Sequence, residues 1–404
     1  MGEHVLQLYM IGVDFTRASM REREPLALVR GQVIEWLPRL REAPGVIGCV
    51  LLATCNRTEL YAHSDGASLD LLSLLCDMAD VDKNLYDAIS VMRTNQDAVR
   101  HLLSVAAGLQ SQIFGDEQII SQVREAWTLA RDCHTCDGVL DTLFRYAVTT
   151  GKQVRAEVDL VNVPASAADT GVCRAIERFG TLQGKRAVVI GNGIVGRRAA
   201  FALHTQGADV TMTLRTYRHG ETIIPSGCRA HPYDRRYEII EGADLVFSAT
   251  ASPHYTITAD KIQTLSQPPA LLIDLAMPRD IEPSVSEDRR VTVWNLDDLS
   301  TAYHGSAENR EAAEKIISEQ TAAFTSWLQY RDALPVIAQM KDTAVERVRH
   351  DHAFNGLYQE KDIDGLLELT VGKTIDLLLG GMKDIVQADY LTACLEHMRR
   401  GGKK

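Results

Sequence analysis

Long apolar runs and an excess of basic charge are both missing from this 404-residue sequence. No stretch reaches the roughly 18 apolar positions that a bilayer-spanning helix needs, so we expect no transmembrane segment and no membrane partner. The 43 basic side chains are outnumbered by 54 acidic ones, which gives a net charge of −11. This balance argues against a protein that grips nucleic acid over its whole surface, although a local basic patch stays compatible with it.

A disulfide framework and a secretory signal are also missing. The eight cysteines are scattered along the chain, which predicts a reducing, cytoplasmic environment. One C-x-x-C stretch, Cys133 to Cys136, could indicate a metal or redox site, but no second ligand pair stands at a matching spacing. We therefore expect no metal site, and a structural or incidental role for this stretch.

The length and composition indicate a soluble protein with several domains. A chain of 404 residues exceeds what one hydrophobic core usually supports, so two or three domains are expected. With 45% hydrophobic and 24% charged residues, the chain has the composition of an ordinary globular protein.

Cys55 follows directly after the apolar run Val46 to Ala53, which predicts a buried strand. The cysteine would then lie at the carboxyl end of a strand, where open α/β structures place their chemistry. Arg57 is close enough to favour the thiolate, which is a good acyl acceptor. The alternative is a half-buried structural cysteine, but its polar neighbours argue against this.

The segments around Cys55 predict the rest of a first domain. Val5 to Val13 is apolar at nearly every position and predicts a strand buried on both faces, and Pro25 to Leu40 is rich in helix formers. Thr94 to Asp97 is a helix start signal, and the helix that follows carries His101. By itself, a histidine in a helix is usually a surface or capping residue.

A second domain is predicted from a strand, a glycine-rich turn and a helix. The apolar strand that ends at Ile190 leads into G-x-G-x-x-G and then into a helix from Arg197. In this context the turn can bring backbone N–H groups and a helix N-terminus to a pyrophosphate. The predicted cofactor loop comprises Gly191, Asn192, Gly193, Ile194, Val195 and Gly196.

The next strand indicates which dinucleotide binds. Asp209 to Leu214 ends at Arg215 and Thr216 rather than at an acidic residue, which suits the 2′-phosphate of NADPH better than the ribose hydroxyls of NADH. The alternative for Arg215 is a solvated turn residue. Two further buried strands end in polar loops that we expect on the nicotinamide side, and the predicted contacts there are Ser248, Ala249, Thr250 and Asp274.

The last hundred residues are dominated by helix formers. Apolar residues from Ala313 to Leu328 keep a three-four spacing, which predicts one long amphipathic helix that ends or kinks at Pro335. A second helical set follows between Leu366 and Leu379. Such a tail cannot bury both of its faces alone, so we expect it to form a dimer.

Thr54 to Tyr61 resembles the T-C-N-R-x-E-x-Y signature of the glutamyl-tRNA reductase family, with Ala53 in place of the usual first hydroxyl residue. Asp97 to Leu102, Gly115 to Ile119 and Leu271 to Ile281 resemble further segments of that family in the same order. The resemblance implies that Cys55 and His101 are catalytic. It also implies substrate-binding roles for Thr54, Arg57, Ser111, Asp116, Gln118, Gln122 and Ser166.

The resemblance implies a multidomain α/β architecture. It comprises an α+β catalytic domain over residues 1–158, a Rossmann-type NADP-binding domain over 159–298, and a spinal helix with an all-α dimerisation domain over 299–404. The implied function is NADPH-dependent reduction of glutamyl-tRNA to glutamate-1-semialdehyde through a thioester on Cys55, the first step of tetrapyrrole synthesis. The implied partners are glutamyl-tRNA, a second copy of the chain and an aminomutase that takes the aldehyde.

Three departures from the family pattern leave other functions open. Gly12 to Thr16 lacks the usual Asn and His, Asp116 replaces a longer acid, and Val161 to Pro164 replaces glycines. A divergent reductase for another aminoacyl-tRNA or a dedicated pathway is one alternative. A non-catalytic regulatory relative is a second, which the intact Cys55 and His101 argue against.

Overall fold

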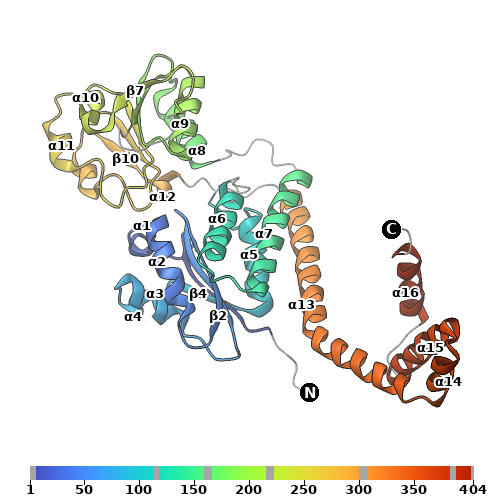
Figure 1. Ribbon diagram of the computed structural model, residues 1–404. Coiled ribbons are helices and arrows are strands. Elements are labelled where there is room, and N and C mark those ends of the chain that lie inside the picture. Colours follow the sequence, from blue (N-terminus) through green and yellow to red (C-terminus); the bar gives the residue numbers. More distant parts are fainter. Residues whose placement is uncertain are drawn as a thin grey trace. The chain divides into compact units, whose positions relative to one another are not determined.

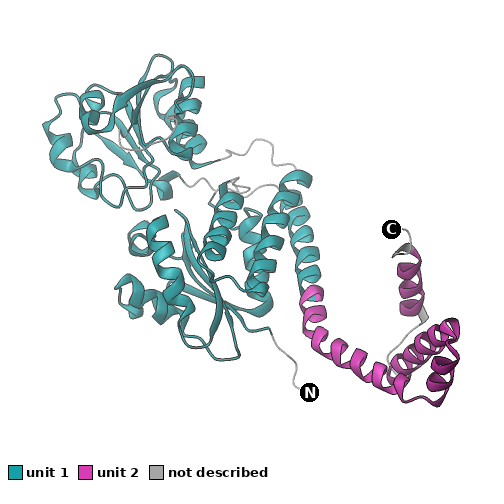
Figure 2. Ribbon diagram, in the orientation of Figure 1, with its two compact units in different colours: residues 1–325 teal, residues 326–404 magenta. Residues whose placement is uncertain are grey.

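The computed structural model describes residues 6–112, 118–158, 166–214, 223–299, 307–382 and 388–401. The chain separates into two compact units, residues 1–325 and 326–404 (Figure 2). No helix within the described ranges is long and apolar enough to cross a membrane.

The first part of unit 1 is built on a four-stranded antiparallel sheet in the order β2-β3-β1-β4 (Figure 1). Helices lie on both faces of this sheet, which explains why every residue of β3 is buried. The strands are β1 (Leu8–Asp14), β2 (Val46–Ala53), β3 (Arg57–Ser64) and β4 (Ser90–Thr94). The helices are α1 (Met20–Arg23), η1 (Glu24–Leu26), α2 (Arg30–Arg41), α3 (Leu71–Ala79), α4 (Lys83–Asp87), α5 (Asn95–Ala106), α6 (Gln118–Asp132) and α7 (Gly138–Glu157).

The predicted strand before Cys55 and the predicted helix around His101 are both present as β2 and α5. As expected, Cys55 follows the carboxyl end of a strand. β2 pairs with β3 in an antiparallel hairpin, so Cys55 lies in a hairpin turn of an antiparallel sheet. The sequence pattern of one strand does not by itself reveal the direction of its neighbours.

The second part of unit 1 is a six-stranded parallel sheet in the order β10-β9-β8-β5-β6-β7, the strand order of a Rossmann fold. Alternate residues of the inner strands enter two separate hydrophobic clusters, one on each face. The strands are β5 (Arg186–Ile190), β6 (Asp209–Leu214), β7 (Arg229–Pro232), β8 (Leu245–Ser248), β9 (Leu271–Asp274) and β10 (Thr292–Trp294). The helices are α8 (Ala167–Phe179), α9 (Ile194–Thr205), η2 (Tyr233–Arg235), α10 (Arg236–Ile240), α11 (Ala259–Thr264), η3 (Pro283–Glu287) and α12 (Leu296–Leu299).

One helix, α13 (Ala307–Arg349), crosses from unit 1 into unit 2. Of the two outcomes expected at Pro335, an end or a kink, the end is wrong, because the helix continues through this residue. A proline removes one N–H bond, and the turns on either side of it are enough to hold a helix of 43 residues. Within unit 1, α13 buries Ala313, Ile317 and Phe324.

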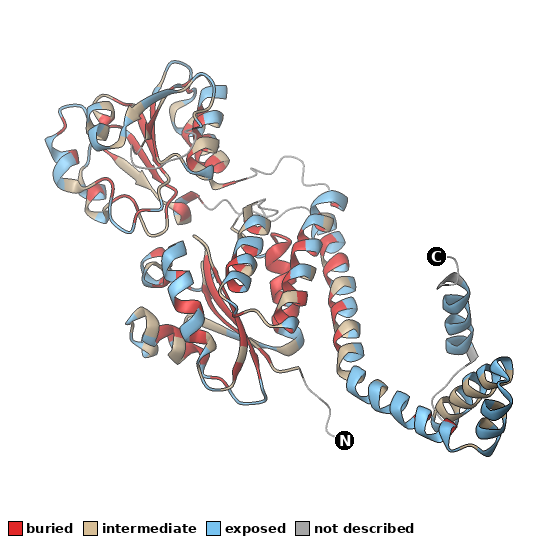
Figure 3. Ribbon diagram, viewed as in Figure 1, coloured by how far each residue is buried: buried red, intermediate tan, exposed pale blue. Residues whose placement is uncertain are grey.

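Unit 2 continues with α14 (His352–Glu360), α15 (Ile363–Gly381) and α16 (Ala388–Gly401), which confirms the helical tail. Neither α14 nor α15 contains a buried residue (Figure 3). On α15, four large apolar side chains at helical spacing are exposed: Ile363, Leu367, Val371 and Ile375. The unit therefore carries an apolar helix face that its own described residues leave uncovered.

Candidate active site

Cys55 is presented by a short turn that Thr54 holds in place. The Thr54 N–H donates to Arg57 O at 2.8 Å, and Thr54 Oγ1 accepts from the N–H groups of Asn56 and Arg57, both at 3.2 Å. A second segment is bound to the turn, because the Phe15 N–H donates to Asn56 O at 3.0 Å. Cys55 is half-buried and its thiol is not in a disulfide. The turn thus fixes the backbone around a partly accessible thiol.

The strand after the turn carries a buried network of ionisable side chains. Arg57, Glu59 and Tyr61 alternate along β3, which places them on one face of the sheet. Glu59 Oε1 accepts from Arg57 Nη1 at 2.7 Å and lies 2.8 Å from His101 Nε2 on α5. Glu59 Oε2 accepts from the Tyr61 hydroxyl at 2.7 Å. The structure therefore joins the predicted residues Arg57 and His101 through one shared carboxylate.

Burial strengthens the electrostatic interactions among the side chains of this network. The side chains of Arg57, Glu59 and His101 are 1%, 2% and 5% exposed. Burial alone opposes ionisation of Glu59, but the charges of His101 and Arg57 and the hydrogen bonds from His101 and Tyr61 hold its pKa well below the usual range. Burial, and next the Glu59 charge, raise the pKa of Tyr61 well above its ordinary value. Glu59 is thus a carboxylate and Tyr61 a neutral donor at neutral pH.

The backbone opposite Glu59 leaves room for its side chain. Gly12 on β1 is the register partner of Glu59, and a Cβ added at Gly12 would lie 2.6 Å from Glu59 Cγ. A side chain at position 12 would therefore displace Glu59 from its bonds with His101 and Arg57. The glycine keeps the network in place although the residues that follow it depart from the family pattern.

The turn after α5 is also tied to Arg57. Arg57 Nη2 donates to Gln110 O, next to the predicted substrate residue Ser111. Gln118 and Gln122 lie in the first turns of α6, both half-buried, whereas Asp116 lies outside the described residues. Ser166 is the N-cap of α8, where its hydroxyl bonds with Asp169, so a substrate contact for Ser166 stays a prediction.

The segment after β1, where the family pattern is lost, lines a hollow. Asp14 Oδ1 accepts from the Thr16 N–H at 2.8 Å and from its hydroxyl at 2.5 Å, which shapes a tight turn. A cavity of about 370 Å³ opens beside this turn. Its lining consists of Phe15, Thr16, Arg17, Ala18, Ser19, Gln112 and Asp297. The Asn56 side chain lies near this group, and its buried Oδ1 has no hydrogen-bond partner among the described residues.

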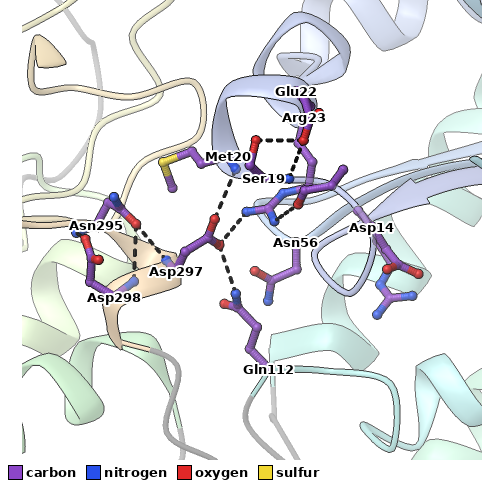
Figure 4. Close-up of polar contacts among 12 residues, drawn as sticks. Asp14, Ser19, Met20, Glu22, Arg23, Asn56, Gln112, Asn295, Asp297 and Asp298 are labelled. Carbon is purple, nitrogen blue, oxygen red and sulfur yellow. Dashed lines mark hydrogen bonds and ion pairs between the residues drawn. The ribbon is translucent and has the colours of Figure 1, made fainter. Parts of the chain in front are cut away.

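Asp297, on α12 after the parallel sheet, holds the helix α1 that follows the hollow. Its carboxylate accepts from Arg23 Nη2 at 2.7 Å, from the Met20 N–H at 3.0 Å and from Gln112 Nε2 at 3.1 Å (Figure 4). The Arg23 side chain is 4% exposed. A second link joins Glu24 to Arg279, whose Nη2 lies 2.5 Å from Glu24 Oε2. Two consecutive residues of the catalytic part thus bind α12 and a loop of the Rossmann part.

The glycine loop after β5 fits a dinucleotide. Gly196 must be a glycine because an added Cβ would lie 2.1 Å from Gly191 O, which brings α9 tightly against the turn. At Gly193, the N-cap of α9, a Cβ would meet nothing within 4 Å, so the protein itself leaves open space there for a ligand. The buried Asn192 Oδ1 has no partner among the described residues, as expected where a ligand supplies the donor. Arg215 and Thr216 lie outside the described residues.

The other predicted cofactor residues shape the adjoining loops. Asp280 accepts from the Ser248 hydroxyl at 2.7 Å and from the Thr250 N–H at 2.7 Å and hydroxyl at 2.5 Å. Asp274 accepts from the N–H groups of Ala276 and Ile281, and its side chain is buried. Ser248, Ala249, Thr250 and Asp274 thus stay predicted cofactor contacts, and the side chains of Ser248 and Asp274 face inward to the loops.

The two cysteines of the C-x-x-C stretch are half-buried. Burial, followed by the charges of Asp141 and Asp137, raises the pKa of Cys136 to about 12, so its thiol is protonated at neutral pH. Among the described residues, no group of three or more His, Cys, Asp or Glu side chains could hold a metal ion.

Several residues of the site were not identified from the sequence. Glu59 has no role assigned from the sequence, although its spacing from Arg57 places both on one strand face. Asn56, Asp280 and Asp297 were also missed as contributors. The partners of Asp280 and Asp297 lie far away in the chain, and a local pattern contains no signal for such contacts.

Three family models match consecutive parts of the chain. They are described as the N-terminal domain of glutamyl-tRNAGlu reductase (residues 11–158), shikimate/quinate 5-dehydrogenase (174–302) and the dimerisation domain of glutamyl-tRNAGlu reductase (312–389).

Curated relatives cover most of the chain. A probable multifunctional siroheme biosynthesis protein HemA of Ruminiclostridium josui is 36% identical over 98% of this chain and 77% of its own. A glutamyl-tRNA reductase of Acetivibrio thermocellus is 38% identical over 81% of this chain and 99% of its own. The solved glutamyl-tRNA reductase from Methanopyrus kandleri is 28% identical over 98% of both chains, with a TM-score of 0.48. On the two sequence relatives and the family models, the chain belongs to the glutamyl-tRNA reductase family.

Proposed function

We propose that this protein is an NADPH-dependent glutamyl-tRNA reductase, which forms glutamate-1-semialdehyde in the first step of tetrapyrrole synthesis. The observation that carries the proposal is the position of Cys55. It lies in the turn that leads directly into the buried network of Arg57, Glu59 and His101, on a chain whose second part has an open dinucleotide loop. This arrangement combines a nucleophile, a proton-transfer group and a hydride source in one protein.

The reaction begins with attack of the Cys55 thiolate on the ester carbonyl of the charged tRNA. A carbon–sulfur bond forms, the ester carbon–oxygen bond breaks, and the ribose oxygen leaves with a proton that His101 supplies. The product is a thioester on Cys55, free of the tRNA. NADPH, when bound, supplies the hydride that converts this thioester to the aldehyde and restores the thiolate.

Arg57 is the proposed reader of the substrate's side-chain carboxylate. Its guanidinium is planar and permanently charged, and it lies two residues from Cys55. One of its nitrogens donates to Glu59 and another to Gln110 O. A substrate carboxylate would therefore use the remaining N–H groups or displace Gln110 O. Such a site selects for an acidic side chain, which favours glutamyl-tRNA over neutral aminoacyl-tRNAs.

The cofactor would be held by the loop from Gly191 to Gly196. Gly193 leaves space for the pyrophosphate, and the N-terminus of α9 favours its negative charge. Arg215 would bind the 2′-phosphate, with Thr216 beside it in sequence. The preference for NADPH over NADH rests on that arginine.

The proposed assembly is a homodimer through the C-terminal helices. The matching model is described as a dimerisation domain, and the exposed apolar face of α15 is suited to a second copy of the chain. Glutamyl-tRNA is the proposed nucleic-acid partner. Transfer of the aldehyde to an aminomutase rests on the family resemblance alone.

A reduction assay with several charged tRNAs tests this function. The purified protein is mixed with NADPH and Glu-tRNA, Gln-tRNA or Asp-tRNA, and the aldehyde product is measured. We expect product from Glu-tRNA, none from Cys55→Ser, and near-normal turnover from Cys228→Ser as the matched cysteine control. Preference for another aminoacyl-tRNA would support a divergent reductase, and absence of product from all of them would support a non-catalytic relative.

A further inference from the structure

We propose that Glu59 is a positioning residue for the reaction: it fixes which nitrogen of His101 carries a proton and balances the charge of Arg57. The inference rests on the proposed function of Cys55 and His101. It adds a residue that acts through Arg57 and His101.

The geometry gives Glu59 a central place among three donors. Its two oxygens accept from Arg57 at 2.7 Å, from Tyr61 at 2.7 Å and from His101 at 2.8 Å. The side chain is 2% exposed, so water does not compete for these bonds. An ionised carboxylate can satisfy three donors at once, whereas an amide of the same shape offers one accepting oxygen and two donating hydrogens.

The carboxylate determines the tautomer of His101. An ionised carboxylate only accepts hydrogen bonds, so His101 Nε2 must carry the hydrogen that it shares with Glu59. The nitrogen left for proton transfer is Nδ1. Without Glu59, nothing among the described contacts of His101 would hold the imidazole in this form.

The same carboxylate serves both Arg57 and His101. Glu59 offsets the permanent charge of the buried guanidinium and also binds the imidazole. Other charged groups reach the cluster from neighbouring elements. Asp14 on β1 acts on Arg57, Arg93 on β4 acts on Tyr61, and Arg100 on α5 pairs with Glu314 of α13. All of these groups remain when Glu59 is changed.

The test is Glu59→Gln, with Asp137→Asn as the matched control. Asp137 also bonds to a buried histidine of β3, His63, at 2.9 Å, but it lies outside the site. Deacylation of Glu-tRNA without NADPH is measured against pH for both variants. In Glu59→Gln, the limb of the profile that His101 causes should move to lower pH, because an opposite charge beside the imidazole is lost. In Asp137→Asn the profile should not move.

The pH profile separates positioning from a purely structural role. A structural role would lower the rate of Glu59→Gln without moving its profile, and that outcome would overturn the proposal. An equally large shift of the pH profile in Asp137→Asn would also overturn the proposal.

A second measurement uses the unmodified protein, in case Glu59→Gln does not fold. Nitrogen-15 NMR of labelled histidines, with the His101 signals identified by their loss in His101→Gln, should show Nε2 protonated throughout and Nδ1 titrating. Titration at Nε2 would overturn the proposal. This spectrum does not depend on turnover, so it still tests Glu59 if the protein turns out not to reduce Glu-tRNA.

Discussion

Replacing Asp297 with asparagine should impair the reduction step more than the formation of the thioester. Asp297 joins α12 of the Rossmann part to Arg23, Met20 and Gln112 of the catalytic part. The variant keeps the shape of the side chain but leaves the buried Arg23 cation without its counter-charge. Reduction needs both parts of unit 1, whereas acylation of Cys55 needs the catalytic part.

The size of the effect follows from the burial of the pair. Removing one partner from a fully buried ion pair costs roughly 3–5 kcal/mol. Asp297 is 34% exposed, so water replaces part of the lost interaction, and the bond from Glu24 to Arg279 still joins the two parts. We therefore expect the substitution to weaken the contact between the catalytic and Rossmann parts by about 2 kcal/mol. This lowers the population in which the two parts are in contact by roughly 30-fold.

The assay separates the two chemical steps. Deacylation of Glu-tRNA without NADPH reports acylation of Cys55, and oxidation of NADPH in a single turnover reports reduction. Asp297→Asn should slow reduction by about 10- to 30-fold and deacylation by less than about threefold. Asp209→Asn breaks an exposed pair with Arg229 on the same sheet and should change neither rate, because such surface pairs contribute about 0–1 kcal/mol. Equal slowing of both steps in Asp297→Asn would show that Asp297 does not act on reduction by joining the two parts of unit 1.

Three further changes test other parts of the account. Arg57→Gln should slow Glu-tRNA more than Gln-tRNA and leave alkylation of Cys55 near neutral pH unchanged; an equal loss for both substrates, with alkylation moved to higher pH, would show that Arg57 mainly activates the thiol. Arg215→Ala should remove most of the NADPH preference at a cost of roughly 1.5–3 kcal/mol, and equal use of NADH by the unmodified protein would contradict this. Burial, followed by the Asp280 charge, raises the pKa of Asp274 to about 8 from its ordinary 3.8. Between pH 3.8 and about 8 the folded state keeps a proton that the unfolded chain loses, so the free energy of unfolding falls as pH rises through this range. Urea unfolding at pH 5.5 and 8 should show a smaller change in this free energy for Asp274→Asn than for the unmodified protein. An unchanged difference would contradict the pKa shift.

The sequence predicted the features that depend on neighbouring residues. The apolar run before Cys55 is a strand, the start signal at Thr94 opens the helix of His101, and the glycine turn connects a strand to a helix. Each of these comes from periodicity or turn chemistry within about ten residues.

The features that were missed depend on contacts between distant segments. A side-chain hydrogen bond between α5 and β3 makes Glu59 the shared partner of Arg57 and His101. At Pro335 the local rule predicted an end or a kink, and the 43-residue helix does not end there. The domain boundaries near 158 and 298 stay predictions.

Mass spectrometry of the protein after incubation with Glu-tRNA and no NADPH detects the proposed thioester on Cys55 itself. We predict an added mass of one glutamyl group on the peptide that contains Cys55, sensitive to hydroxylamine and removed when NADPH is added. The adduct should be missing from Cys55→Ser and present in Cys228→Ser. An adduct on another cysteine, or none on a protein that still reduces Glu-tRNA, would contradict the thioester mechanism.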